Sequence, residues 1–347
     1  MREQALRIGR TGATDRERRN LLREYLQHVL LRSLFDERLL GEIVFHGGTA
    51  LRILHDLARF SEDLDFHTLA GAGTPGGGAG STGKEASAAE EGTGVTRERA
   101  SAVDEGTDVT REGASAVDEG TDVTRDGASA VDEGTGVTRE RASVADDGAR
   151  SSAGSFDLGD HLDGVVSKIE SGGYRVDTKP RTQGNVQSCM FRFPELLYEC
   201  DLSPRPEEKL SIRLEIDRRP PAGFTIERSP VDRYFPFVVV HHDRPTFLAG
   251  KLHALLQRPF AKGRDYYDVM FYLQRWPEVA PNLEYLNAAL RQTGYQGEPV
   301  TEASWKGLVA ERVREVDWAA IERDIAPFIL RAGDLDAFER EFLLRLL

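Results

Sequence analysis

This chain of 347 residues has few cysteines, no long apolar run and no apolar leader. Its two cysteines, Cys189 and Cys200, are too few for a disulfide framework and lack the spacing of a metal site. No stretch approaches about 18 consecutive apolar residues, so we expect no membrane-spanning helix. Residues 1–20 carry charges but no apolar segment, so we expect no signal peptide. These absences are typical of a protein of the reducing cytoplasm.

The negative charge of the chain is concentrated in one segment. Residues 86–150 contain 16 acidic residues and 7 arginines, a net charge of −9, so the rest carries −4 of the total of −13. The part with a foldable composition is therefore only mildly acidic. Its overall charge neither excludes nor indicates a nucleic-acid partner.

Residues 70–155 differ in composition from the rest. A glycine-rich run is followed by a 14-residue repeat, whose copies begin at Ala86, Ala100, Ala114 and Ala128, with a shorter fifth copy at Ala142. No copy contains an aromatic residue, so a copy cannot bury enough apolar surface to offset about 1–2 kcal/mol of backbone entropy per residue. We predict a disordered insertion in a surface loop. The alternative is an acidic interaction tail or a repeat solenoid.

Hydrophobic periodicity predicts an α+β fold, with a mixed sheet, flanking helices and a C-terminal helical region. The expected parts are residues 1–69 as the first half of the core, 70–155 as the insertion, 156–245 as the second half and 246–347 as the helical region. Helices are predicted at 14–35, 49–58, 158–171, 246–258 and 263–274, and throughout 281–347. Strands are predicted at 42–46, 63–66, 174–179, 185–192, 209–217 and 237–240, with 218–245 otherwise irregular. The arginines of the first helix are interpreted as a solvated face.

The segment Phe45–Phe66, FHGGTALRILHDLARFSEDLDF, carries the main chemical signal. Backbone amides at a helix N-terminus bind phosphate, and glycines allow close approach, so Gly47, Gly48 and Thr49 are candidates to hold a triphosphate. Asp63 and Asp65 lie two apart on a predicted strand and point to the same side. Carboxylate oxygens are the ligands that Mg²⁺ prefers.

A third carboxylate on a neighbouring strand would complete a two-metal site for nucleotidyl transfer. In the predicted strand at 209–217, Glu215 is the first choice and Asp217 the substitute. Each piece alone is weak evidence, because glycine pairs are common in turns and paired aspartates are common on surfaces. The combination and order of these pieces are far more specific.

Several polar residues have two interpretations from the sequence alone. Lys251 reads as a solvated lysine of an amphipathic helix, and Asp265 as a charge favoured near a helix N-terminus. Arg59 is either a phosphate contact or a residue that flanks the strand. His46 is better interpreted as a packing residue than as a ligand.

Taken together, GGTALR, RFSEDLDF and the later KLHALLQRPFAKGRDYYDV closely resemble the AbiEii/AbiGii-type nucleotidyltransferase toxins. These belong to the DNA polymerase β-like minimal nucleotidyltransferase superfamily. The resemblance covers roughly residues 15–68 and 156–275, and the repeat insertion departs from the family pattern. It assigns the catalytic motif to Gly47, Gly48, Asp63 and Asp65, and a later motif to Lys251, Arg264 and Asp265, with Asp268 one helical turn on. It implies that Lys251 contacts nucleotide phosphates and that Asp265 orients the site.

The resemblance implies a Mg²⁺-dependent enzyme that moves a nucleotide from an NTP to an acceptor hydroxyl, with tRNA or another RNA as acceptor. It also implies the toxin of a type IV-like abortive-infection system, with a cognate antitoxin. Arg213, Arg218 and Arg219 would suit an RNA backbone, or would simply balance neighbouring acids. Two alternatives stay open, namely transfer to a small molecule or protein, and a non-catalytic module that binds a partner through the acidic repeat.

Overall fold

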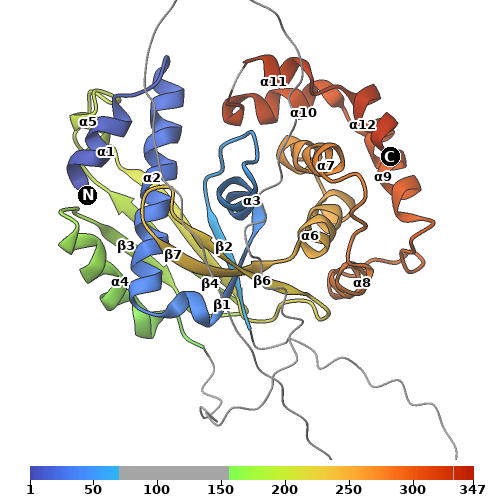
Figure 1. Ribbon diagram of the computed structural model, residues 1–347, viewed down its shortest axis with the longest axis horizontal. Helices are drawn as coiled ribbons and strands as arrows, with labels where there is room; N and C mark the ends of the chain where they lie inside the picture. The colour runs from blue at the N-terminus through green and yellow to red at the C-terminus, as the bar shows by residue number, and fades with distance from the viewer. Residues whose placement is uncertain (70–155, 331) are drawn as a thin grey trace, which may run out of the picture. The chain divides into compact units, whose positions relative to one another are not determined.

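The described residues of the computed structural model are 1–69, 156–330 and 332–347, and their strands form one mixed sheet (Figure 1). The sheet has seven strands in the order β3-β4-β5-β2-β1-β7-β6. The strands are β1 Ile43–His46, β2 Leu64–Thr68, β3 Asp177–Arg181, β4 Val186–Phe193, β5 Leu210–Asp217, β6 Ile226–Val231 and β7 Phe237–His242. The predicted disordered insertion, residues 70–155, lies outside the described residues. The α+β class with a mixed sheet is confirmed.

The strand directions bring three functional segments together at one end of the central strands. β2 pairs with β5 in parallel, and β1 is antiparallel to β2. The end of β1 therefore lies level with the start of β2, where His46, Asp65 and Glu215 are neighbours across three strands. This end of the strands carries the glycine pair, the two aspartates and Glu215.

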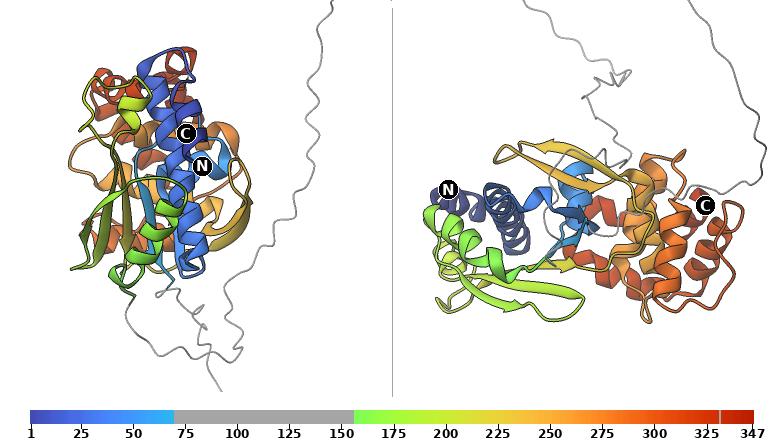
Figure 2. Two further views of the ribbon diagram at one scale, coloured as in Figure 1. Left: turned by 90° about the vertical axis from the view of Figure 1, so that its left-hand side faces the viewer. Right: turned by 90° about the horizontal axis from the view of Figure 1, so that it is seen from below.

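Helices cover both faces of the sheet (Figure 2). Helices α6 to α9 gather on the side opposite α1 and α4 in Figures 1 and 2. The helices are α1 Arg2–Gly9, α2 Asp15–Asp36, α3 Gly47–His55, α4 Gly159–Ser171, α5 Leu196–Glu199, α6 Arg244–Gln257, α7 Gly263–Arg275, α8 Leu283–Gln292, α9 Trp305–Glu315, α10 Trp318–Ile325, α11 Ala332–Asp336 and α12 Arg340–Leu346, with 3₁₀ turns η1 Leu39–Gly41 and η2 Ala326–Phe328. None of the described helices is long and apolar enough to span a membrane.

Local sequence signals account for most element boundaries. Thr14 is the N-cap of α2, and its Oγ1 accepts a hydrogen bond of 3.1 Å from the Glu17 amide. In β5, Leu210, Ile212, Leu214 and Ile216 are buried, and the residues between them are more exposed. The alternation predicted for 209–217 is therefore confirmed.

Several expectations about local structure were wrong. The C-terminal region is not helical throughout 281–347, because the described residues between Gln292 and Trp305 form no helix. Helix α3 begins at Gly47 and ends at His55, because Asp56 takes a left-handed conformation with φ of 56°. Residues 226–231, predicted to be irregular, form β6. The proline at 230 is tolerated there because β6 is an edge strand. The arginines of α2 are not all solvated, since the Arg23 side chain is only 22% exposed.

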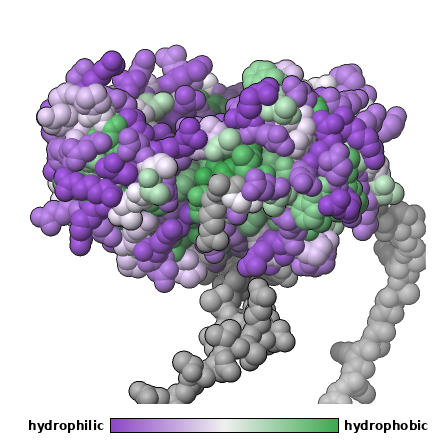
Figure 3. Space-filling view, turned by 90° about the horizontal axis from the view of Figure 1, so that it is seen from above, coloured by the Kyte–Doolittle hydropathy of each residue, from purple (hydrophilic) through white to green (hydrophobic). Residues whose placement is uncertain are grey.

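The C-terminal helices pack against the loop that precedes β2. The Phe60 amide donates a hydrogen bond of 2.7 Å to the Phe328 carbonyl, and the Tyr267 hydroxyl donates to the Ala58 carbonyl at 3.2 Å. Trp318 and Phe338 are buried, and their rings lie 4.8 Å apart. On the face shown in Figure 3, hydrophilic residues line the margins and apolar residues gather toward the middle. The C-terminal helices thus support the loop that carries Arg59 and Asp63.

Candidate active site

The strand-to-helix turn at Gly47 and Gly48 needs both glycines. Gly47 has φ of 78°, which side-chain-bearing residues rarely adopt, and a Cβ there would collide with Asp65 Oδ2. A Cβ at Gly48 would lie 2.6 Å from Arg59 Nη2 and 3.0 Å from Ser61 Oγ. Because α3 starts at Gly47, its first amides have no partner within the helix. The turn therefore presents backbone donors directly beside an acidic side chain.

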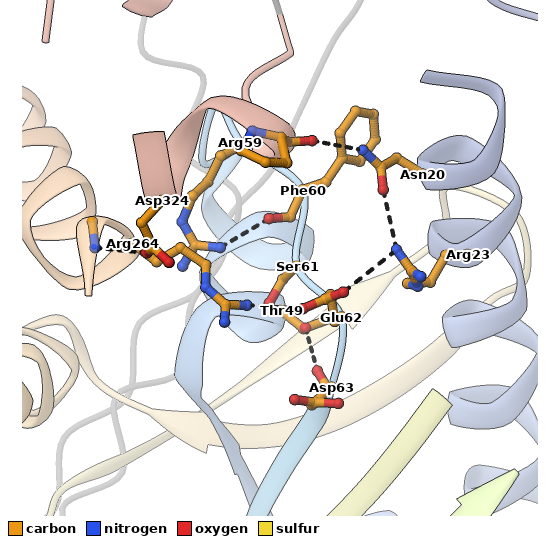
Figure 4. Close-up of polar contacts among 12 residues, drawn as sticks. Asn20, Arg23, Thr49, Arg59, Phe60, Ser61, Glu62, Asp63, Arg264 and Asp324 are labelled. Carbon is orange, nitrogen blue, oxygen red and sulfur yellow. Dashed lines mark hydrogen bonds and ion pairs between the residues drawn. The ribbon is translucent and has the colours of Figure 1, made fainter. Parts of the chain in front are cut away.

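The loop that carries Asp63 is held from two sides. Thr49 Oγ1, in the first turn of α3, donates to the carbonyl of Asp63. Gln27 Nε2, from α2, donates to the carbonyls of Ser61 and Glu62, both at 3.0 Å. Figure 4 shows this loop between α2 and α3. The predicted phosphate-binding residue Thr49 thus uses its side chain to position Asp63.

Sheet register places Glu215 beside Asp65. In the parallel pairing of β2 with β5, Asp65 is the partner of Glu215, and His67 is the partner of Asp217. Paired residues in neighbouring strands point to the same face, so Asp65 and Glu215 share a face. Asp217 lies two pairs further along the strand. Glu215 Oε1 lies 3.3 Å from Arg213 Nη1.

The surroundings of Asp63 and Asp65 disfavour the ionised forms of both carboxyl groups. Burial raises the pKa of Asp63 to about 6, with further contributions from the charges of Asp65 and Glu215. Burial also raises the pKa of Asp65, although nearby Lys251 and Arg264 oppose the shift. Carboxylates held close together in a partly buried place are typical of functional sites.

The donor set suits a hard divalent cation, because it consists of carboxylate oxygens that repel one another. Bound positive charge would relieve the repulsion between Asp63 and Asp65. Within the described ranges, however, no group of three His, Cys, Asp or Glu side chains is arranged to hold a metal ion. Glu215 is instead turned to Arg213. The metal set Asp63, Asp65 and Glu215 therefore stays a prediction.

Lys251 is not a solvated lysine. Its side chain is 12% exposed, and its Nζ lies 2.7 Å from Asp268 Oδ2. The other partner of this carboxylate is Arg59, whose Nε and Nη2 each donate a hydrogen bond of 2.6 Å. Burial alone would raise the pKa of Asp268, but the charges of Arg59 and Lys251 outweigh burial and lower the pKa. Asp268 thus holds two cations next to the glycine turn and Asp65.

The later motif is divided between two ion pairs. Asp265, in the first turn of α7, lies 3.1 Å from Arg258 at the end of α6. Arg264 Nη1 lies 3.2 Å from Glu62 Oε2, in the loop before Asp63. Both Arg258 and Arg264 oppose the rise in the pKa of Asp65. Arg264 therefore lies near the acidic pair, whereas the contact of Asp265 is with Arg258.

A cluster of three histidines lies beside the turn, and only His46 was singled out from the sequence. His67 Nε2 lies 2.6 Å from His242 Nε2, and the His46 ring lies 5.4 Å from each of the other two rings. Burial lowers the pKa of His46 to about 4 and of His67 to about 3. The interpretation of His46 as a packing residue agrees with these contacts. The sequence offered no signal for the cluster, because its members come from β1, β2 and β7.

The sequence patterns did not reveal the structural roles of two further residues, Asp268 and Arg23. Asp268 was noted only as lying one turn after Asp265, yet it is fully buried and holds Arg59. Its signal was a charged residue among Tyr266, Tyr267 and Val269, on a helix whose core face it shares. Arg23 was assigned to a solvated face, and it lies beside Glu62 at 3.9 Å (Figure 4).

The family described as nucleotidyl transferase AbiEii toxin, type IV toxin–antitoxin system, matches residues 25–150 and 153–340. The chain belongs to this family of nucleotidyltransferase toxins, and the family implies a cognate antitoxin. The resemblance drawn from the sequence motifs is thereby confirmed.

The chain matches two solved structures at low sequence identity. The crystal structure of JHP933 from Helicobacter pylori shares 14% identity at a TM-score of 0.42, covering 94% of this chain and 88% of that one. A candidate nucleotidyltransferase from H. pylori shares 14% identity at a TM-score of 0.42, covering 94% of this chain and 90% of that one. No curated protein matches the chain.

Proposed function

We propose that this protein transfers a nucleotide from an NTP to an acceptor hydroxyl of tRNA or another RNA, with Mg²⁺ as cofactor. The observation that carries the proposal is the pairing of Asp65 with Glu215 in the β2–β5 register, with Asp63 two residues before Asp65. Three carboxylates at one end of the central strands, next to a helix N-terminus, suit a phosphoryl-type transfer. Such a reaction depends mainly on positioning and charge.

The donor triphosphate would lie at the N-terminus of α3. The first amides of α3, at Gly47, Gly48 and Thr49, would donate hydrogen bonds to its phosphate oxygens. Lys251 and Arg264, whose charges already act on Asp65, would offset its negative charge. Asp268 would keep Lys251 pointed at the site.

Asp63, Asp65 and Glu215 would hold the metal, with Asp217 as the substitute that the register favours less. Bound there, Mg²⁺ would supply charge neutralisation and acidify the attacking hydroxyl. Asp265, paired with Arg258, would support the end of α6 next to the site.

As a toxin of this family, the protein would block translation by modifying RNA, and a cognate antitoxin would relieve the growth arrest. The abortive-infection role would follow if phage infection releases this activity. Its substrates, NTPs and RNA, would place the reaction in the cytoplasm.

The test is to incubate the purified full chain with labelled NTPs, Mg²⁺ and total tRNA. We expect label on the RNA, and we expect Asp63→Asn and Asp65→Asn each to lower the rate at least about 100-fold, since metal binding stabilises the transition state by several kcal/mol. Glu215→Gln should lower it similarly, with Asp217→Asn as the matched control that retains most activity. If no label is transferred to RNA, parallel reactions with small molecules and lysate proteins decide whether another acceptor is used. If Asp63→Asn behaves as wild type, the proposed mechanism is wrong.

A further inference from the structure

Besides Lys251 and Arg264, a second group of cations lies at this end of the central strands. It is next to Asp63 and includes residues of α2. It lines a cavity of about 360 Å³ between α2 and the start of β5. Its basic residues are Arg19 and Arg23 from α2, and Lys209 and Arg213 from the β5 side. Asp63 also lines the cavity, so the candidate metal ligand borders the space that a bound molecule would fill.

Arg23 is incompletely compensated in its surroundings. Its Nη1 donates a hydrogen bond of 3.1 Å to Asn20 Oδ1, and the nearest carboxylate oxygen, on Glu62, is 3.9 Å from Nη1. Its Nε is buried and has no hydrogen-bond partner. Burial is the main reason that the pKa of Arg23 is lowered. A partly buried cation of this kind is stabilised by an anion that supplies the missing acceptors.

Two other cations of the cavity, Arg19 and Arg213, form ion pairs that an anion can replace. Arg19 Nη1 lies 2.7 Å from Glu208 Oε1, and both side chains are more than one-third exposed. Arg213 and Glu215 form a similarly exposed pair at 3.3 Å. Exposed ion pairs contribute little stability, so exchanging one for a phosphate costs little.

The groups assigned to the donor, namely Gly47, Gly48, Lys251 and Arg264, are not among the residues that line the cavity. Lys251 is held by Asp268 at 2.7 Å, and Arg264 borders the cavity only through Glu62, whose carboxylate it contacts at 3.2 Å. Attacking and leaving oxygens lie roughly in line in this class of reaction, so the donor and the acceptor approach from two sides. With the donor phosphates at the N-terminus of α3, the α2 side is left for the acceptor.

We propose that the cavity between α2 and β5 binds a backbone phosphate of the RNA acceptor and so positions its hydroxyl beside Asp63. This inference rests on the proposed nucleotidyl transfer. Arg23 and Arg19 are positioning residues in this scheme, and Arg213 links the cavity to Glu215.

The experiment compares Arg19→Gln and Arg23→Gln with Arg16→Gln, an exposed arginine on the same helix, as the matched control. In steady-state transfer assays, we expect the cavity variants to raise KM for tRNA about tenfold and to leave KM for the NTP within about twofold, because they remove binding that is uniform along the reaction. Arg23→Lys should recover part of the loss. A rise in KM for the NTP instead would place the donor in the cavity and overturn the proposal.

A binding measurement separates this inference from the catalytic proposal. Fluorescence anisotropy of labelled tRNA, without NTP, is recorded from low to moderate salt. Each cavity variant should bind more weakly and reduce the slope of log Kd against log salt by about 1, as expected for one lost phosphate contact. If wild-type protein transfers no nucleotide but the slopes differ in this way, the cavity inference stands and the catalytic proposal fails. If the cavity variants and Arg16→Gln bind alike, the inference is wrong.

Discussion

Arg59 and Asp268 meet through two hydrogen bonds of 2.6 Å, although 209 positions separate them in the sequence. Their side chains are 2% and 0% exposed. Lys251 shares the same carboxylate. One buried acid therefore joins the loop before β2 to α6 and α7, and it fixes the surroundings of the glycine turn.

Asp268→Asn should be strongly destabilising, because it leaves two buried cations without their counter-charge. We expect the free energy of unfolding to fall by about 3–5 kcal/mol. Urea denaturation measures this. Arg175→Gln is the control, because it removes an exposed pair with Glu195 and should change stability by less than about 1 kcal/mol. A loss of that small size for Asp268→Asn would contradict the role given to this residue.

Gly47→Ala should disrupt the site locally. The left-handed φ costs about 1–2 kcal/mol with a side chain present, and the new Cβ pushes against Asp65. We expect nucleotide transfer to fall by about 100-fold, because small displacements of reacting groups are costly. The control is Gly307→Ala in α9, where a Cβ meets no atom within 4 Å. That substitution should raise stability by about 0.5–1 kcal/mol and preserve activity.

Asp63→Asn should stabilise the metal-free protein at pH 7.5. The pKa of Asp63 in the folded protein, about 6, lies above the ordinary value of 3.8, so ionisation of this carboxylate destabilises the fold. The destabilisation reaches its full size above about pH 6. The gain, up to about 3 kcal/mol, should shrink as the pH falls from 6 to 4. Thermal unfolding in a metal chelator at pH 7.5 and pH 4 tests this. A gain that is the same at both pH values would refute the assignment of strain to this carboxylate.

The histidine cluster should make the fold sensitive to acid. Burial lowers the pKa values of His46, His67 and His242 below 6.5, so protons bind the unfolded chain first as the pH falls. The contribution of the neutral histidines to the free energy of unfolding is therefore complete above about pH 6.5. It should decline by several kcal/mol toward pH 4. We expect His242→Leu to show a shallower decline. Urea denaturation of both proteins at pH 7.5 and 5 makes the comparison. Both proteins also carry Asp63→Asn, which removes a carboxylate whose effect on stability changes with pH in the opposite direction. Equal slopes would rule out the cluster as the cause.

Local patterns were enough to predict much of the fold. The alternation in β5, the cap at Thr14 and the glycine pair before α3 all depend on neighbouring residues, and they are read directly from the chain. The edge strand β6 was missed because Pro230 and polar residues obscure its alternation. The candidate acids Asp63 and Asp65 were also found locally from their spacing, although Asp63 lies in the loop just before β2 and only Asp65 is on the strand.

The sequence by itself determined the family, the mixed α+β architecture and the position of the glycine–aspartate segment. Tertiary structure alone decided that Glu215, rather than Asp217, lies beside Asp65, because register is set by the packing of whole strands. It alone paired Arg59 and Lys251 with Asp268, and it brought Arg23 to the cavity beside Asp63. Such contacts join residues that are far apart in the chain, so they depend on burial and long-range geometry that no local spacing encodes.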